Sequence, residues 1–168
     1  VRHANRVKSL SLLMSSDNSP WNPAPDPRVL WRLNGGGIKG HHLEAARARS
    51  LAFWKVVKSP LYPIEERAML ERLEANYHRS YRPAGVLRQM RAIMATGSLA
   101  GLGPKIRIPV KVVHGDADLL VRPLAAKKLA ARIPEARLEI INGMGHDLPE
   151  QLVPRYVELI TRTIERAE

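Results

Sequence analysis

One stretch of the chain, residues 106–149, constrains the fold more than any other. It begins with a short, mostly β-branched apolar run at 108–113, which is typical of a parallel strand covered on both faces. A helical repeat of apolar residues follows from Pro123 and ends at Pro134. A second apolar run occupies residues 138–141. This order predicts a β-α-β unit, whose two strands lie parallel in one sheet with a right-handed crossover.

Polar residues that can do chemistry follow both predicted strands. Asp116 and Asp118 come after the first strand, and His146 comes after the second. Because the carboxyl ends of parallel strands meet at one sheet edge, we expect these side chains to lie close together. A buried carboxylate that accepts a hydrogen bond from one imidazole nitrogen leaves the other nitrogen free to act as a general base. Taken singly, the aspartates also fit a role in capping the following turn, and His146 fits an ordinary loop position.

The whole arrangement resembles the last third of an α/β-hydrolase. The segment Gly115-Asp116-Ala117-Asp118 matches the turn that carries the acid of the catalytic triad in that family, and the segment 143–149 matches the histidine loop. The resemblance implies that Asp118 is the triad acid and His146 the triad histidine. It also implies that Asp116 and Asp147 support these two loops.

A narrower resemblance concerns the esterase-like hydrolases grouped around aclacinomycin methylesterase. The matching residues lie at 80–89 (Ser-Tyr-Arg-Pro-Ala-Gly-Val-Leu-Arg-Gln) and at 143–149 (Gly-Met-Gly-His-Asp-Leu-Pro), with a weaker match at 9–16. This similarity implies a serine hydrolase of carboxylic esters that uses water as its second substrate and needs no cofactor. Its partner would be a small-molecule ester.

The chain lacks the nucleophile turn of that family. A Gly-x-Ser-x-Gly turn should precede the acid and the histidine in chain order, and no such pentapeptide occurs here. None of the serines has the required flanking glycines: Ser9, Ser11, Ser15, Ser16, Ser19, Ser50, Ser59, Ser80 and Ser98. We therefore expect this chain alone to be inactive. Since it begins at Val1 and residues 1–7 match the end of the helix after the nucleophile, we expect a C-terminal portion of a longer protein.

The residues before the β-α-β unit predict one further strand and a helical insertion. Residues 8–15 have the pattern of a sheet strand, which the resemblance places next to the strand that carries the acid. Four prolines between residues 17 and 27 then exclude regular structure. The glycine run at 35–37 lacks the features of a phosphate loop and predicts a flexible loop.

Apolar residues at helical spacing predict three helices, at 43–57, 64–77 and 86–94. Together they match the size of a cap that closes a mostly apolar pocket and excludes water. We therefore expect three parts: residues 1–20 as a core strand with the end of a helix, 21–99 as the cap, and 100–168 as the C-terminal core with a last helix. Five residues are candidates for substrate binding, although each also fits plain packing: Met14, Trp54, Tyr81, Met90 and Met94.

Composition and charge argue against several classes of function. The 168 residues are 45% hydrophobic, enough for one domain with a core, and no apolar run approaches the ~20 residues of a membrane-spanning helix. The net charge of +11 is spread over most segments and paired with glutamates, so we expect neither a nucleic-acid nor a membrane partner. The adjacent His41 and His42, expected on a helix, suit no metal motif, and we predict no metal. A chain without cysteine fits any compartment, and we take the cytoplasm as the working expectation.

Other functions remain open at this point. Proline iminopeptidase-like, haloperoxidase-like and C–C-bond hydrolases share the same C-terminal half and differ in nucleophile turn and cap. A non-catalytic binding module would keep the pocket without the chemistry. The fold class that we predict is α/β, with about three parallel strands, flanking helices and a helical cap.

Overall fold

The computed structural model describes residues 3–40 and 42–167 of the chain. In these residues three parallel strands form one sheet in the order β1 (Leu10–Leu13), β2 (Val110–Gly115) and β3 (Ala136–Ile141). The predicted parallel β-α-β unit is thus confirmed, as is the strand near the N-terminus that pairs with β2. The predicted strand at 108–113 begins and ends two residues later in the structure. This shift leaves Pro109, which has no N–H to donate to a ladder, outside the strand.

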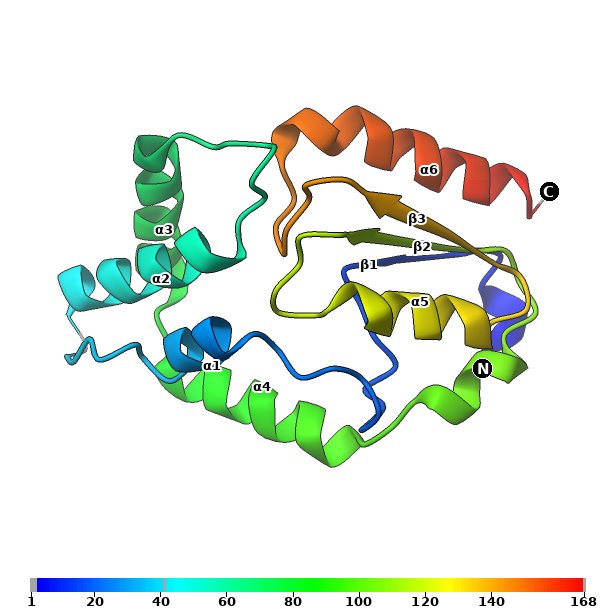
Figure 1. Cartoon of the computed structure of the whole chain (residues 1–168), viewed down its shortest axis with the longest axis horizontal. Helices are drawn as coiled ribbons and strands as arrows, with labels where there is room; N and C mark the ends of the chain where they lie inside the picture. The colour runs from blue at the N-terminus through cyan, green and yellow to red at the C-terminus, as the bar shows by residue number, and fades with distance from the viewer. Residues whose placement is uncertain (1–2, 41, 168) are drawn as a thin grey trace.

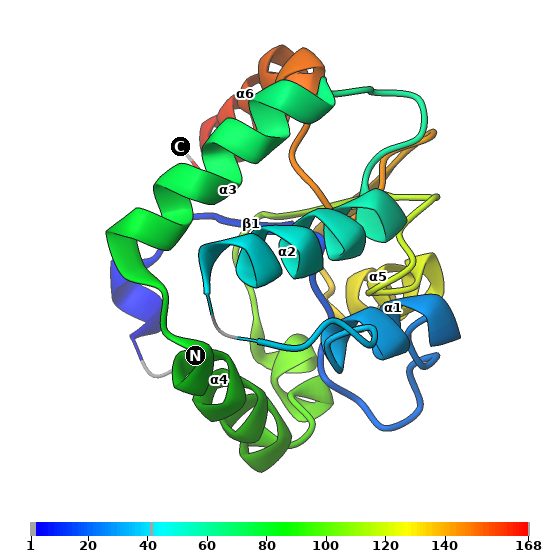
Figure 2. The same cartoon turned by 90° about the vertical axis from the view of Figure 1, so that its left-hand side faces the viewer.

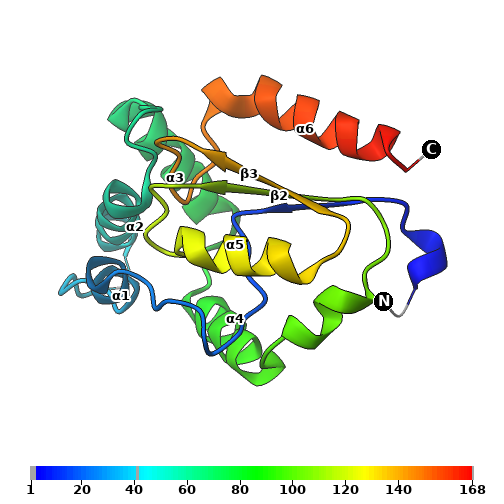
Figure 3. The same cartoon turned by 45° about the vertical axis from the view of Figure 1, so that its right-hand side comes forward.

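The sheet is covered on both faces, as the apolar strands predicted. Helix α5 (Pro123–Arg132) packs on one face and α6 (Val153–Glu165) on the other (Figures 1 and 3). Alternate residues of β2 pack into the cores on the two faces of the sheet, because successive side chains of a strand point to opposite faces. Val110 and Val112 join the core under α5, and Val113 joins the core under α6.

A helical insertion connects β1 to β2. It holds α1 (Pro27–Leu33), α2 (Leu43–Val57), α3 (Glu66–Ser80) and α4 (Pro83–Thr96), and the 3-10 helix η2 (Ala100–Lys105) leads back to the sheet. The two ends of the insertion meet, since the backbone N–H of Leu99 donates to the carbonyl of Asp17 at 2.7 Å. The strands β2 and β3 point towards α1, α2 and α3 (Figure 1), and Figure 2 shows α1 to α4 from that end of the molecule.

Two local expectations were wrong. The sequence predicted three helices in this insertion, and α1 was missed although its start carries a recognisable signal. Asp26 precedes Pro27, and its carboxylate accepts the N–H of Arg28 as an N-cap. His42 lies just before α2 rather than on it, and His41 lies outside the described residues.

Two short 3-10 helices complete the described elements. Residues 1–7 were expected to end a helix, but residues 1–2 lie outside the described part and η1 (Ala4–Arg6) is a 3-10 turn. The second, η3 (Glu150–Leu152), leads directly into α6. None of the described helices is both long and apolar enough to cross a bilayer.

Gly115, the last residue of β2, provides a stability test. A Cβ at this position would lie 1.9 Å from the backbone oxygen of Met144, so the loop after β3 would have to move. We expect Gly115→Ala to lower the free energy of unfolding by about 1–3 kcal/mol, the range for overpacking. Gly101→Ala is the matched control, because nothing lies within 4 Å of its Cβ position. Equal urea-unfolding midpoints for the two variants would contradict the close approach.

Candidate active site

The two loops predicted to meet do so at the carboxyl ends of β2 and β3. The imidazole Nδ1 of His146 donates to Oδ2 of Asp118 at 2.7 Å. Asp118 is fully buried, whereas the His146 side chain keeps 24% of its surface exposed. This is the geometry in which a carboxylate fixes the imidazole tautomer and leaves Nε2 to face a substrate.

The loop after β2, residues 116–121, is called the acid loop below, and its backbone explains how the buried charge of Asp118 is tolerated. Oδ1 of Asp118 accepts the N–H groups of Leu120 and Val121 at 2.9 and 2.8 Å. Oδ2 accepts from His146 and also lies 3.3 Å from Nε2 of His114. Burial alone would raise the pKa of Asp118, but the hydrogen bonds from His114 and His146 outweigh it and lower the pKa to about 2. The carboxylate is therefore ionised at neutral pH.

Asp116 joins the acid loop to the histidine loop. Its Oδ1 accepts the N–H of Gly143 at 2.7 Å, and the N–H of Ala117 donates to the carbonyl of Met144 at 3.1 Å. Gly143 has a φ of 66°, a backbone conformation that glycine adopts without strain. These contacts fix the separation of the two loops.

A segment at the end of α2 clamps the histidine loop from the other side. The N–H of His146 donates to the carbonyl of Val57 at 2.7 Å, and the N–H of Gly145 donates to Oγ of Ser59 at 2.8 Å. Ser59 in turn donates its hydroxyl and its N–H to Oδ1 of Asp147. Burial raises the pKa of Asp147, and the hydrogen bonds from Ser59 oppose that rise. We call residues 57–61 the clamp segment.

A cavity of about 670 Å³ lies beside His146. Its walls come from the end of β1, the segment 62–65, the start of α3 and the histidine loop. Its lining combines apolar residues, among them Met14, Tyr62, Met69 and Leu148, with charged ones: Glu65, Arg72, Asp147 and Glu150. A concave, partly apolar cavity of this size with one imidazole in its wall is typical of a small-molecule site.

Only Met14 of the five predicted substrate-binding residues borders this cavity. It has a φ of 48°, a conformation that is uncommon for a residue other than glycine. Trp54 is buried in α2, with the ammonium of Lys58 5.0 Å from the centre of its ring. Tyr81 accepts a hydrogen bond from Arg49 at 2.8 Å and lines a separate cavity between α2, α3 and α4.

The last two predicted residues lie on the surface. Met90 and Met94 sit on α4 with 38% and 74% of their surface exposed. A role in substrate binding stays a prediction for all five residues.

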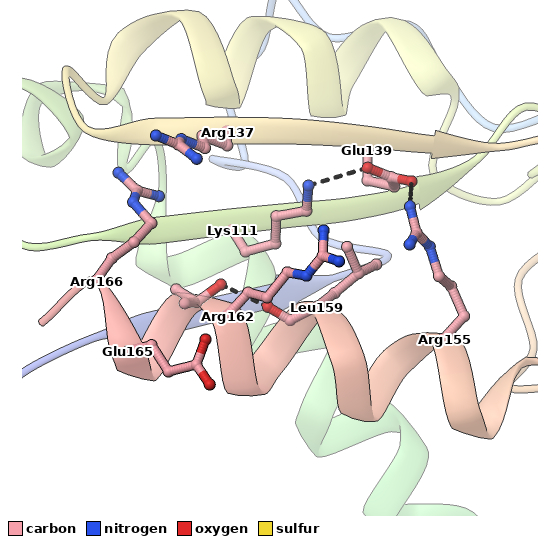
Figure 4. A pocket seen from close by; sticks show the side chains of 9 residues that line it. Lys111, Arg137, Glu139, Arg155, Leu159, Arg162, Glu165 and Arg166 are labelled. Carbon is pink, nitrogen blue, oxygen red and sulfur yellow. Dashed lines mark hydrogen bonds and ion pairs between the residues drawn. The ribbon is translucent and has the colours of Figure 1, made fainter.

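A further cavity, of about 400 Å³, lies between the sheet and α6 (Figure 4). Its lining is strongly charged, and Glu139 bridges Lys111 and Arg155 there. Arg162 pairs instead with Glu158 on its own helix at 2.7 Å. The described residues contain no group of three or more His, Asp or Glu side chains placed to hold a metal ion. Of this cavity and the one beside His146, the one beside His146 is the larger, and His146 connects it to the buried Asp118.

Sequence reasoning missed three residues of this site. His114 lies 3.3 Å from the Asp118 carboxylate, Ser59 binds the histidine loop, and Tyr62 lines the cavity. His114 had a usable signal, because it is a polar residue at the end of an apolar strand. Ser59 and Tyr62 had none, since only the packing of the insertion against the histidine loop brings them there.

Solved structures match almost the whole chain. The enol-lactonase from Burkholderia xenovorans LB400 is 20% identical with a TM-score of 0.72, covering 98% of this chain and 58% of that one. The meta-cleavage product hydrolase from Pseudomonas fluorescens IP01 is 18% identical with a TM-score of 0.70, covering 99% of this chain and 59% of that one. The esterase RhEst1 from Rhodococcus sp. ECU1013 is 20% identical with a TM-score of 0.67, covering 96% and 57%.

These structures are enzymes of the α/β-hydrolase fold, and the chain shares that fold. It spans less than two thirds of the length of each of them, so the match is to part of the fold. No protein-family model matches the sequence, and no curated protein matches it. The fold-level prediction is confirmed, whereas the narrower resemblance to aclacinomycin methylesterase is not shown.

The lowered pKa of Asp118 predicts how stability depends on pH. A carboxyl whose folded pKa lies below its unfolded value of 3.8 stabilises the fold above that value, and the stabilisation is lost as the pH falls towards about 2. The difference corresponds to on the order of 2 kcal/mol. We expect the unfolding free energy of Asp118→Asn to fall less than that of the unmodified chain between neutral pH and about pH 2, because the variant lacks the contribution of the Asp118 carboxylate. Urea unfolding at the two pH values measures this difference. Glu71→Gln, an exposed carboxylate on α3, should keep it.

The clamp segment predicts a local effect of Ser59→Ala. The substitution removes the acceptor for the N–H of Gly145 and one donor to Asp147, and we expect a loss of about 1–3 kcal/mol in unfolding free energy. Amide hydrogen exchange at Gly145 and His146 should become faster. Ser50→Ala, which changes an exposed serine on α2, is the control. Unchanged exchange at Gly145 would show that Ser59 does not hold the loop.

Proposed function

We propose that this chain supplies the acid and the histidine of a serine hydrolase that cleaves carboxylic esters. The observation that carries the proposal is the 2.7 Å hydrogen bond from His146 Nδ1 to the buried Asp118, with His146 in the wall of a partly apolar cavity. His146 would act first as general base, taking the proton from a serine nucleophile, and then as general acid towards the leaving alcohol. Asp118 would hold the imidazole in the required tautomer and stabilise its charged form.

The nucleophile in this proposal lies outside the chain. No Gly-x-Ser-x-Gly occurs in the sequence, and in this fold the nucleophile precedes the acid and the histidine. The chain would then be the C-terminal part of the enzyme, with residues 21–99 as the cap over the pocket and residues 1–20 and 100–168 as core. Reading the coding sequence upstream of Val1 tests this directly. An open frame that encodes the nucleophile turn supports the proposal, and a start codon immediately upstream favours a binding module without catalysis.

Activity measurements on the complete protein test the roles of the two residues. We expect Asp118→Asn and His146→Ala each to lower turnover of a carboxylic ester by about three to four orders of magnitude while the fold survives. His78→Ala is the control, because His78 is an exposed histidine on α3. Near-normal turnover in either of the first two variants would rule out the assignment.

The choice of an ester rests on the resemblance at residues 80–89 and 143–149 and on the partly apolar cavity. The structural neighbours include an enol-lactonase and a meta-cleavage product hydrolase as well as esterases, so related substrates need a direct comparison. A panel of simple esters, lactones, peptides and diketones separates these classes. Turnover of the diketones alone would replace the ester proposal with carbon–carbon bond cleavage.

A further inference from the structure

His114 is a buried polar side chain that the proposed reaction does not use. It is the residue before Gly115 at the end of β2, and none of its surface is exposed. On an alternating strand it shares a face with Val110 and Val112, which form the apolar core under α5. An apolar residue is what the pattern of this strand would place there.

The contacts of the ring fix which nitrogen carries the proton. Nε2 lies 2.7 Å from the carbonyl oxygen of Val121 and 3.3 Å from Oδ2 of Asp118. Both of these neighbours are acceptors, so Nε2 must be the donor. Nδ1, on the other side of the ring, is buried and has no hydrogen-bond partner among the described residues.

The unpartnered Nδ1 makes the presence of a histidine unfavourable on packing grounds alone. A buried polar atom without a partner destabilises the fold, and an apolar side chain of similar volume would avoid that penalty. A histidine at this position therefore needs a reason other than packing, and the contacts of its other ring nitrogen, Nε2, provide that reason. The Nε2–H group reaches both the acid and the turn that follows it.

We propose that His114 is a positioning residue that holds the carboxylate of Asp118 in place to receive His146. The inference deepens the proposed function and rests on it. His114 acts in two ways. Its N–H donates to the carbonyl of Val121, whose own N–H binds Oδ1, and its Nε2 also lies 3.3 Å from Oδ2, the oxygen that binds His146. Both oxygens of Asp118 are thus oriented by groups that do not depend on the partly exposed histidine loop.

The charge state of Asp118 agrees with this role. Burial raises its pKa, and the hydrogen bond from His114 is the largest of the opposing effects, ahead of the one from His146. The contact of His114 with Oδ2 comes from β2 and not from the histidine loop, so it does not depend on where that loop lies.

The test uses NMR on the 168-residue chain with 15N-labelled histidine. In the unmodified chain we expect His114 as the Nε2–H tautomer and a strongly downfield Nδ1–H resonance from His146, because that proton is held by Asp118. In His114→Leu we expect the downfield resonance to be lost or shifted upfield, and the carboxyl titration of Asp118 to move up from about 2. In His114→Gln, whose amide N–H can reach a position close to that of Nε2, we expect the resonance to be retained.

The outcomes separate the two proposals. An absent downfield resonance in the unmodified chain would contradict the Asp118–His146 pair and with it the proposed function. A present resonance that is unchanged in His114→Leu would overturn only the role of His114, as would an Nδ1–H tautomer at His114. Folding is checked by circular dichroism, with His78→Leu on the exposed face of α3 as the matched control. If His114→Leu does not fold, two results can still overturn the proposal. One is the Nδ1–H tautomer at His114 in the unmodified chain, and the other is a folded His114→Gln variant that lacks the downfield resonance.

Discussion

The close packing of the loop after β2 against the loop after β3 is the contact on which the candidate site depends. Gly115 makes it possible, since any side chain there would collide with the backbone of Met144. The N–H of Ala117 and the carboxylate of Asp116 then tie the two loops together. With the loops at this separation, Asp118 and His146 lie within hydrogen-bond distance although 28 positions separate them in the chain.

A buried charge is the second constraint, and it explains why so many groups surround one carboxylate. Moving an ionised carboxyl out of water is strongly unfavourable unless donors replace the water. Backbone N–H groups of the following turn and two histidine rings supply those donors around Asp118. The same donors fix the direction of the carboxylate, so the stability of the site and its orientation have one physical cause.

The clamp segment makes the helical insertion part of the site rather than a separate lobe. Ser59 of the clamp segment binds the backbone N–H of Gly145 and the carboxylate of Asp147, which lie 86 and 88 positions further along the chain. The cavity beside His146 also takes its walls from both the sheet and the insertion. A change in the insertion that displaces residues 57–61 would therefore move His146 as well as the cavity wall.

The sequence alone predicted the three parallel strands and placed the carboxylates after β2 and His146 at one sheet edge, because apolar periodicity and the residues at strand ends are local properties. It missed α1, whose start is marked only by Asp26 and Pro27 within a proline-rich connection. Only the tertiary structure placed Met90 and Met94 on the surface, and only it brought Ser59 to the site. The reason is that those positions follow from how the insertion packs on the sheet edge, which depends on contacts between residues far apart in the chain.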